Sequence, residues 1–176
     1  RELAVSNVVR SIYMVMMTPI WGFSQTSNSM VSNLIGQKRE NEVLALVKKI
    51  TRMSLLTCLA GIGLSVFFSD PLFLLSTSDL SVIQEARGSF YVVCAATFFF
   101  SFSMVFLSAI SGTGKTKAAM VIEVICLIAY IIYSVLFTVL RPANLEVIWG
   151  AEVLYWCMMG LVSWQYLKAG KWRCNN

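Results

Sequence analysis

Five long stretches of this 176-residue chain contain no charged residue, and they constrain the fold more than any motif does. They cover residues 11–37, 53–69, 88–114, 124–140 and 153–167. Crossing about 30 Å of hydrocarbon takes about 20 helical residues, so the first and third stretches can span a bilayer unaided. The other three reach that length when their apolar flanks are included. The sequence therefore predicts an all-α membrane protein with five transmembrane helices.

The overall composition agrees with a membrane environment. Hydrophobic residues make up 57% of the chain and charged residues only 13%, about half of the roughly 25% that is usual in soluble domains. The net charge of +5 resembles that of nucleic-acid-binding proteins. However, the basic residues lie at the ends of the apolar stretches and not along one face, so membrane topology explains them better and no nucleic-acid partner is expected.

The charges also predict an orientation for residues 1–176, taken as a single unit. We expect helices at about 8–35, 43–68, 84–111, 116–140 and 145–168, with turns at Asp70-Pro71 and Arg141-Pro142. Most basic residues fall on one side of this arrangement: Lys38, Arg39, Lys48, Lys49, Arg52, Lys115, Lys117, Lys168, Lys171 and Arg173. The positive-inside rule makes that side cytoplasmic and places the C-terminus there, in a multi-pass protein of the inner (plasma) membrane.

Metal and cofactor chemistry has little support in the sequence. The chain contains no His, and Cys58, Cys94, Cys126 and Cys157 lie far apart within predicted spans. Buried cysteines without ligand spacing pack as small apolar residues. We therefore expect no metal, no cofactor and no enzymatic activity.

Polar residues within the predicted spans are the candidate functional residues, because polar groups at membrane depth usually face a partner or a wet cavity. The first helix carries most of them. Pro19 should kink the helix or leave a carbonyl free, and Gln25, Asn28 and Ser29 are candidates to line a cavity. For Ser and Thr residues, packing between helices is an equally good explanation.

Two acidic residues also fall within spans. At about 1.5 Å per residue, Glu123 and Glu152 each lie about 10 Å from a helix end. Tyr130 shares a helix face with Glu123, and Tyr155 shares one with Glu152, and we include both tyrosines among the cavity residues. A carboxyl group among Tyr and apolar side chains is a candidate for ion coupling. Its alternative role is to reach the headgroups or to bind a neighbouring helix.

Residues 109–116 read Ala-Ile-Ser-Gly-Thr-Gly-Lys-Thr, one residue short of the phosphate-binding pattern GxxxxGK[ST]. That pattern needs a strand before the glycine-rich loop. Here the preceding apolar stretch is too long for a strand, so a P-loop nucleotide-binding protein is only a distant alternative. A turn between two spans accounts for the glycines.

With these spans in place, the chain resembles the C-terminal lobe of the multidrug and toxic compound extrusion (MATE) family. The resemblance rests on Pro-Ile-Trp-Gly at 19–22 with Val-Ser-Asn-Leu-Ile-Gly-Gln at 31–37, Ser-Gly-Thr-Gly-Lys-Thr-Lys at 111–117, and Trp-Gly-Ala at 149–151. These stretches resemble the end of the second helix of a repeat, the turn between its fourth and fifth helices, and the start of its sixth.

This resemblance implies a MATE-type transporter with two lobes and twelve helices, of which this chain would be a C-terminal fragment with helices eight to twelve. Its partners would be membrane lipid, the missing N-terminal half, small-molecule drugs, and protons or sodium. The activity would be efflux of amphipathic or cationic drugs by ion-coupled antiport, and a lipid-linked saccharide flippase of the same fold is the alternative. The chain begins at Arg1 without an initiator Met, as expected of a fragment.

Two departures from the family pattern affect the ion site. Lys115 replaces the usual Asp of the turn, and residues 88–114 contain no acid where some members carry one. Glu123 and Glu152 are therefore the remaining candidates for ion coupling.

Overall fold

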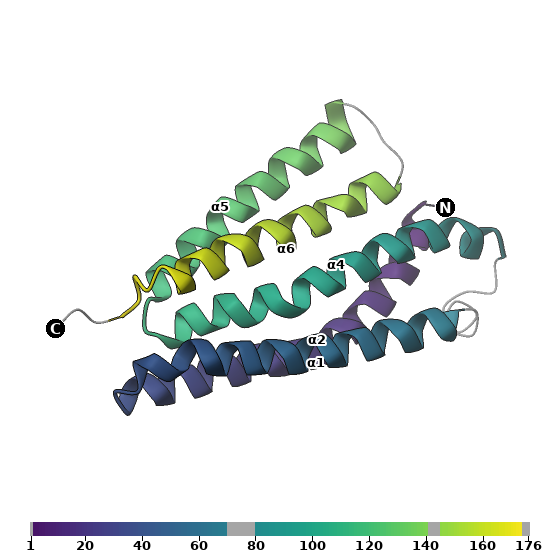
Figure 1. Cartoon of the computed structure of the whole chain (residues 1–176). Coiled ribbons are helices and arrows are strands. Elements are labelled where there is room, and N and C mark those ends of the chain that lie inside the picture. The colour runs from purple at the N-terminus through teal and green to yellow at the C-terminus, as the bar shows by residue number, and fades with distance from the viewer. Residues whose placement is uncertain (1, 70–79, 141–144, 174–176) are drawn as a thin grey trace.

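The computed structural model describes residues 2–69, 80–140 and 145–173, and the regular structure within these ranges is helical (Figure 1). The long helices are α1 (Glu2–Gly36), α2 (Val43–Phe67), α4 (Leu80–Gly112), α5 (Thr116–Val135) and α6 (Leu145–Lys168). A short 3-10 helix, η1 (Glu40–Glu42), precedes α2, and a π-helical segment, η2 (Leu136–Leu140), extends α5. The predicted all-α class is confirmed.

The helix bounds agree closely with those expected from the charge-free stretches. The largest difference is at the start of α1, which begins at Glu2 instead of residue 8. The predicted turns at Asp70-Pro71 and Arg141-Pro142 lie outside the described residues.

Among the described residues, four helical segments are long and apolar enough to cross a membrane. They are Glu40–Phe67, Arg87–Gly112, Thr116–Thr138 and Val147–Lys168. The 35-residue α1 has the length, but the Ser, Thr, Asn and Gln residues of its second half lower its hydropathy. Polar side chains in a helix of this kind need neighbours or water to satisfy them. That α1 also crosses the membrane stays a prediction.

Helix α4 is the centre of the bundle. It packs against all four other long helices, and in Figure 1 it lies between the α1–α2 pair and the α5–α6 pair. In the most apolar 18-residue part of each helix, 61% of the α4 residues are buried inside the chain, whereas only 11% of the α5 residues are. Helix α5 packs mainly on α6, so most of its apolar surface is left for lipid or for another part of a transporter.

Serine hydroxyl groups join the helices to α4. Ser27 of α1 donates a hydrogen bond to the Val105 carbonyl at 3.1 Å, and Ser54 of α2 donates to the Ser101 carbonyl at 2.8 Å. Ser103 of α4 donates to the carbonyl of Trp156 in α6 at 2.6 Å. Small polar residues let helix backbones approach closely in a membrane, and such bonds contribute about 0.6 kcal/mol each on average. These serines therefore hold the helices together.

The glycines of residues 109–116 are explained by the turn between α4 and α5. Gly112 lies against α1, where a Cβ atom would be only 2.6 Å from the backbone oxygen of Asn28. Gly114 has φ of +82°, a conformation that glycine adopts without steric cost. The segment follows helix α4 directly, where a phosphate-binding P-loop follows a strand, so it lacks the geometry of that loop.

Candidate substrate and ion site

A cavity of about 550 Å³ lies between α1, α5 and α6. It is lined by aromatic, apolar and charged side chains, namely Arg10, Tyr13, Met14, Met17, Trp21, Tyr130, Ile148, Trp149, Glu152 and Trp156. Its volume falls within the range of about 300–1,000 Å³ that is typical of small-molecule sites. One carboxyl group and one guanidinium group are its charged components.

The Glu152 carboxyl group is held by two donors from different helices. Its Oε2 atom accepts a hydrogen bond from the Trp156 indole at 2.9 Å and another from the Tyr13 hydroxyl at 3.2 Å. The same indole N–H also lies 3.0 Å from the Tyr13 oxygen, so the three groups form a closed triangle. The Tyr130 hydroxyl also interacts with Glu152. The carboxyl group is thereby fixed in position between α1, α5 and α6.

Aromatic rings surround this triangle. The Trp156 ring packs against Phe100 and Tyr155, with ring centres 4.5 and 4.7 Å apart. Tyr155 in turn packs against Tyr130 at 5.8 Å, and Tyr13 meets Trp149 edge-on at 6.2 Å. Aromatic faces carry partial negative charge and attract cations. Together with the carboxyl group they make the cavity suited to an amphipathic ligand with a positive charge.

Helical spacing places these side chains in the cavity. Glu152 and Trp156 are four residues apart on α6, so they lie on the same helix face. Arg10, Tyr13 and Met17 follow one another at spacings of three and four residues along α1, so they also share a helix face. Figure 1 shows that α1 changes direction near its middle. Pro19 lies inside α1 and lacks the N–H that would complete the helix ladder, which accounts for the bend.

The structure places the predicted site residues in three groups. Tyr130 and Glu152 line the cavity, and the ring of Tyr155 packs against that of Tyr130. Asn28 is half-buried near Gly112, and three other predicted residues of α1 are exposed, namely Pro19, Gln25 and Ser29. Glu123 is exposed on α5, on the side towards Tyr155. The cavity therefore includes one of the two predicted acids.

Several cavity residues were not predicted as site residues. Trp156 could have been found from its spacing of four residues after Glu152. Tyr13 could not, because it is 139 residues from Glu152 in sequence and only the packing of α1 near α6 brings them together. Arg10, which immediately precedes the first apolar stretch, also lines the cavity.

No group of three or more metal-ligating side chains occurs in the described parts of the chain.

The MatE family model matches residues 1–136, which is more than half of the chain. The chain belongs to the MatE family. This family consists of all-helical membrane transporters, so the MatE chain is part of a MATE-type multi-pass transporter. No curated protein and no solved structure matches the MatE chain. Glu152 and Trp156 lie beyond the matched residues, on α6.

Proposed function

We propose that this MatE chain belongs to a secondary active transporter that exports amphipathic, cationic compounds in exchange for protons or sodium. The observation that carries the proposal is the aromatic-lined cavity in which Tyr13 and Trp156 hold the Glu152 carboxyl group. A carboxylate beside aromatic faces binds a positively charged organic group through both charge and ring contacts. It also binds a proton or a sodium ion.

Exchange follows if drug and ion compete for Glu152. When a proton or sodium ion occupies the carboxyl group, its negative charge is neutralised and a cationic drug loses its partner. When the ion leaves, the charge is restored and the drug can bind again. Arg10 in the same cavity strengthens this effect, because neutralising Glu152 leaves the cavity lining with a net positive charge that repels a cationic drug. Alternating access between two lobes would then carry each ligand in opposite directions.

The exposed face of α1 supports a second lobe as partner. Gln25 and Ser29 are exposed and bind no described residue. A polar face at membrane depth is costly against lipid, so we propose that it faces a partner half of the transporter and the water-filled path between the halves. Pro19 lies on the same exposed side. In this arrangement these residues and Asn28 contact the drug along its path.

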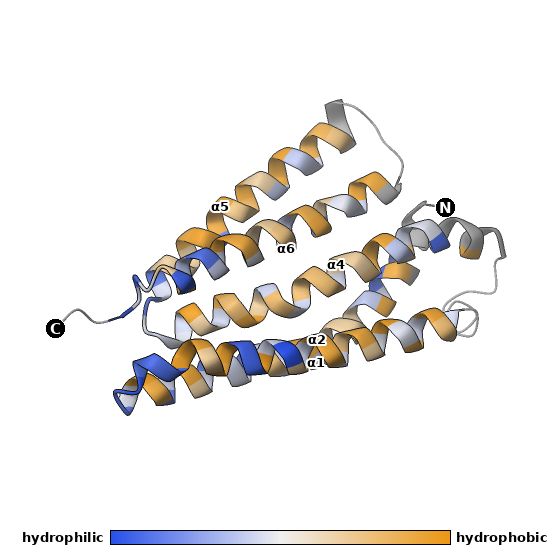
Figure 2. Cartoon of the chain, in the orientation of Figure 1, coloured by the Kyte–Doolittle hydropathy of each residue, from blue (hydrophilic) through white to orange (hydrophobic). Residues whose placement is uncertain are grey.

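We further propose that the C-terminus is cytoplasmic and that the protein lies in the plasma membrane. Figure 2 shows hydrophilic residues gathered at the end of the bundle that contains the α1–α2 connection and the end of α6. The basic residues named above lie at this end, which supports a cytoplasmic position by the positive-inside rule.

The same fold could serve a lipid-linked saccharide flippase, and Arg10 is the observation that favours it. A guanidinium group in the cavity can bind a phosphate. A pyrophosphate-linked substrate, however, calls for several basic groups, and Glu152 opposes its negative charge. Drug export is therefore the better-supported function, and a test with both substrate classes distinguishes the two.

The decisive experiment uses the full-length transporter in proteoliposomes with an imposed proton or sodium gradient. We expect gradient-dependent movement of cationic dyes, and we expect Glu152→Gln to abolish it while leaving the helical content unchanged. Gln keeps the size and the hydrogen-bond acceptor but removes the charge. Glu123→Gln, the second proposed coupling position, is measured alongside and should reduce transport less, because Glu123 is exposed and outside the cavity.

Two outcomes would contradict the proposal. If no cationic dye moves with the gradient while a lipid-linked saccharide does, the flippase function replaces it. If Glu152→Gln transports dye at the wild-type rate at every pH, the cavity does not couple the ion to the drug.

A further inference from the structure

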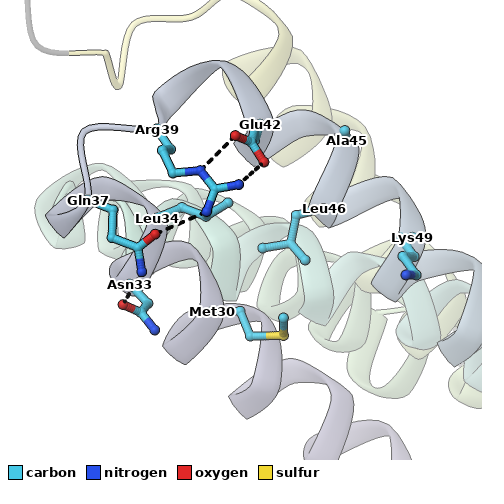
Figure 3. A pocket seen from close by; sticks show the side chains of 9 residues that line it. All are labelled: Met30, Asn33, Leu34, Gln37, Arg39, Glu42, Ala45, Leu46 and Lys49. Atoms are coloured by element: carbon cyan, nitrogen blue, oxygen red, sulfur yellow. Dashed lines mark hydrogen bonds and ion pairs between the residues drawn. The ribbon is translucent and has the colours of Figure 1, made fainter.

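A second pocket, of about 370 Å³, lies between α1 and α2 at the hydrophilic end of the bundle (Figure 3). It is lined by Met30, Asn33, Leu34, Gln37, Arg39, Glu42, Ala45, Leu46 and Lys49. This pocket is separate from the cavity around Glu152 and has a different chemistry. Apolar side chains line part of it, and groups that donate hydrogen bonds lie at its edge.

Arg39 is held at this edge by hydrogen bonds to Glu42 and Gln37. Its Nε and Nη2 atoms donate to the two carboxylate oxygens of Glu42, each at 2.7 Å, and its Nη1 atom donates to Gln37 at 3.1 Å (Figure 3). Glu42 raises the pKa of Arg39, so the guanidinium group stays charged at any physiological pH. A guanidinium group has five N–H donors. Arg39 therefore keeps two donors for a ligand.

Two further donors lie beside Arg39. The Asn33 side-chain oxygen accepts a hydrogen bond from Gln37 at 3.1 Å, and this fixes the amide so that its NH₂ group remains available. Lys49 lines the pocket and has no ion-pair partner among the described residues. Its neighbour Lys48 points elsewhere, with its ammonium group 5.9 Å from the centre of the Trp164 ring. Lys49 is thus the pocket's unpaired cation.

The charges of the pocket match a monoanion. Arg39 and Glu42 neutralise each other, and Lys49 leaves one positive charge. A phosphodiester carries one negative charge and oxygen atoms that accept several hydrogen bonds. The apolar side chains of Met30, Leu34 and Leu46 beside these donors would have no role with a free inorganic ion. They fit the first methylene groups of an acyl chain.

We propose that the pocket between α1 and α2 binds the phosphodiester headgroup of an anionic membrane phospholipid. Lys49 and Arg39 bind the phosphate, Asn33 donates to it, and the apolar side chains contact the lipid tail. This site rests on the proposed topology, which places it at the cytoplasmic leaflet where anionic lipids are enriched. Lys49 is six residues into α2, about 9 Å along the helix axis, a depth from which a long side chain reaches the headgroups.

The test measures binding of a short-chain, fluorescent phosphatidylglycerol to the full-length transporter in neutral detergent micelles. Neutral micelles remove the surface potential that would attract the lipid nonspecifically. The matched variants are Lys49→Gln and Lys48→Gln, which remove the same charge from adjacent positions. A charge-assisted hydrogen bond contributes about 1.5–3 kcal/mol, so Lys49→Gln should weaken binding about tenfold or more. Lys48→Gln should change it by less than about twofold.

Three controls decide the outcome. The corresponding phosphatidylcholine should bind more weakly than phosphatidylglycerol, inorganic phosphate should fail to displace the lipid, and drug transport by Lys49→Gln reports separately on the main cavity. Equal losses in the two lysine variants, or equal binding of the two lipids, would overturn the proposal. Displacement by millimolar inorganic phosphate would overturn it as well, because the ligand would then be a free anion.

Discussion

Replacing Gly112 by Ala tests whether close contact between α1 and α4 determines the stability of the bundle. The new Cβ atom would lie 2.6 Å from the Asn28 carbonyl oxygen and 3.0 Å from the Val31 Cβ atom. The first neighbour is backbone, so no change of rotamer relieves the clash, and the two helices must separate. Separation also weakens the hydrogen bond from Ser32 to the Gly112 carbonyl, now 3.0 Å long.

The expected magnitude follows from these contacts. Overpacking of this kind costs about 1–3 kcal/mol, and a lost interhelical hydrogen bond in a membrane costs about 0.6 kcal/mol. Alanine regains about 0.5–1 kcal/mol over glycine inside a helix, and less at Gly112 because it is the last residue of α4. The free energy of unfolding should therefore fall by about 1–3 kcal/mol.

Gly63→Ala is the matched control. Gly63 lies inside α2, and a Cβ atom there meets nothing within 4 Å. This variant should be more stable than the wild type by about 0.5–1 kcal/mol. Both free energies can be measured by unfolding in mixed detergent micelles, followed by the loss of helical circular dichroism. The reasoning is refuted if Gly112→Ala unfolds at the same denaturant concentration as the wild type, or if both variants shift in the same direction.

Two further predictions concern the cavity and the core. Tyr13→Phe removes one hydrogen-bond donor to Glu152 but keeps the ring against Trp149. Dye transport should therefore fall, while the free energy of unfolding drops by only about 0.6 kcal/mol, and at most about 1.7 kcal/mol. A larger loss of stability in the same unfolding assay would mean that the hydroxyl is mainly structural. Three cysteines are buried, namely Cys58, Cys94 and Cys126. A maleimide should label them only after denaturant unfolds the protein, which mass spectrometry of each peptide would report. Labelling of Cys126 before unfolding would contradict the packing of α5 on α6.

The sequence predicted the helices well because a membrane leaves few alternatives. A charge-free stretch of sufficient length must form a helix there, since its backbone groups find no water. The starts of α2, α5 and α6 were predicted only by adding the apolar flanks, because the charge-free stretches themselves begin at residues 53, 124 and 153. The start of α1 at Glu2 was less predictable, because the helix continues through charged residues at its beginning. The end of α5 was less predictable because the π-helical segment Leu136–Leu140 extends it.

The candidate site was only partly accessible from the sequence. Glu152, Tyr130 and Tyr155 could be identified because an acid at membrane depth and its helical neighbours stand out locally. The partners of Glu152 could not all be identified in this way. Tyr13 reaches Glu152 from the other end of the chain, and no local pattern records which face of α1 turns towards α6. Conversely, Gln25 and Ser29 are conspicuous in the sequence, yet their function depends on a surface that this bundle alone does not cover.

The arrangement of α5 and α6 has a mechanical consequence. These two helices form a hairpin, and its half that contains Glu152 approaches α1 mainly through the side chains that surround Glu152. Nearer the other end, Gly160 lies so close to Phe102 and Ser103 of α4 that a larger side chain would not fit there. Any movement of α6 away from α1 therefore has to break the hydrogen bonds that join Tyr13 to Glu152 and Trp156.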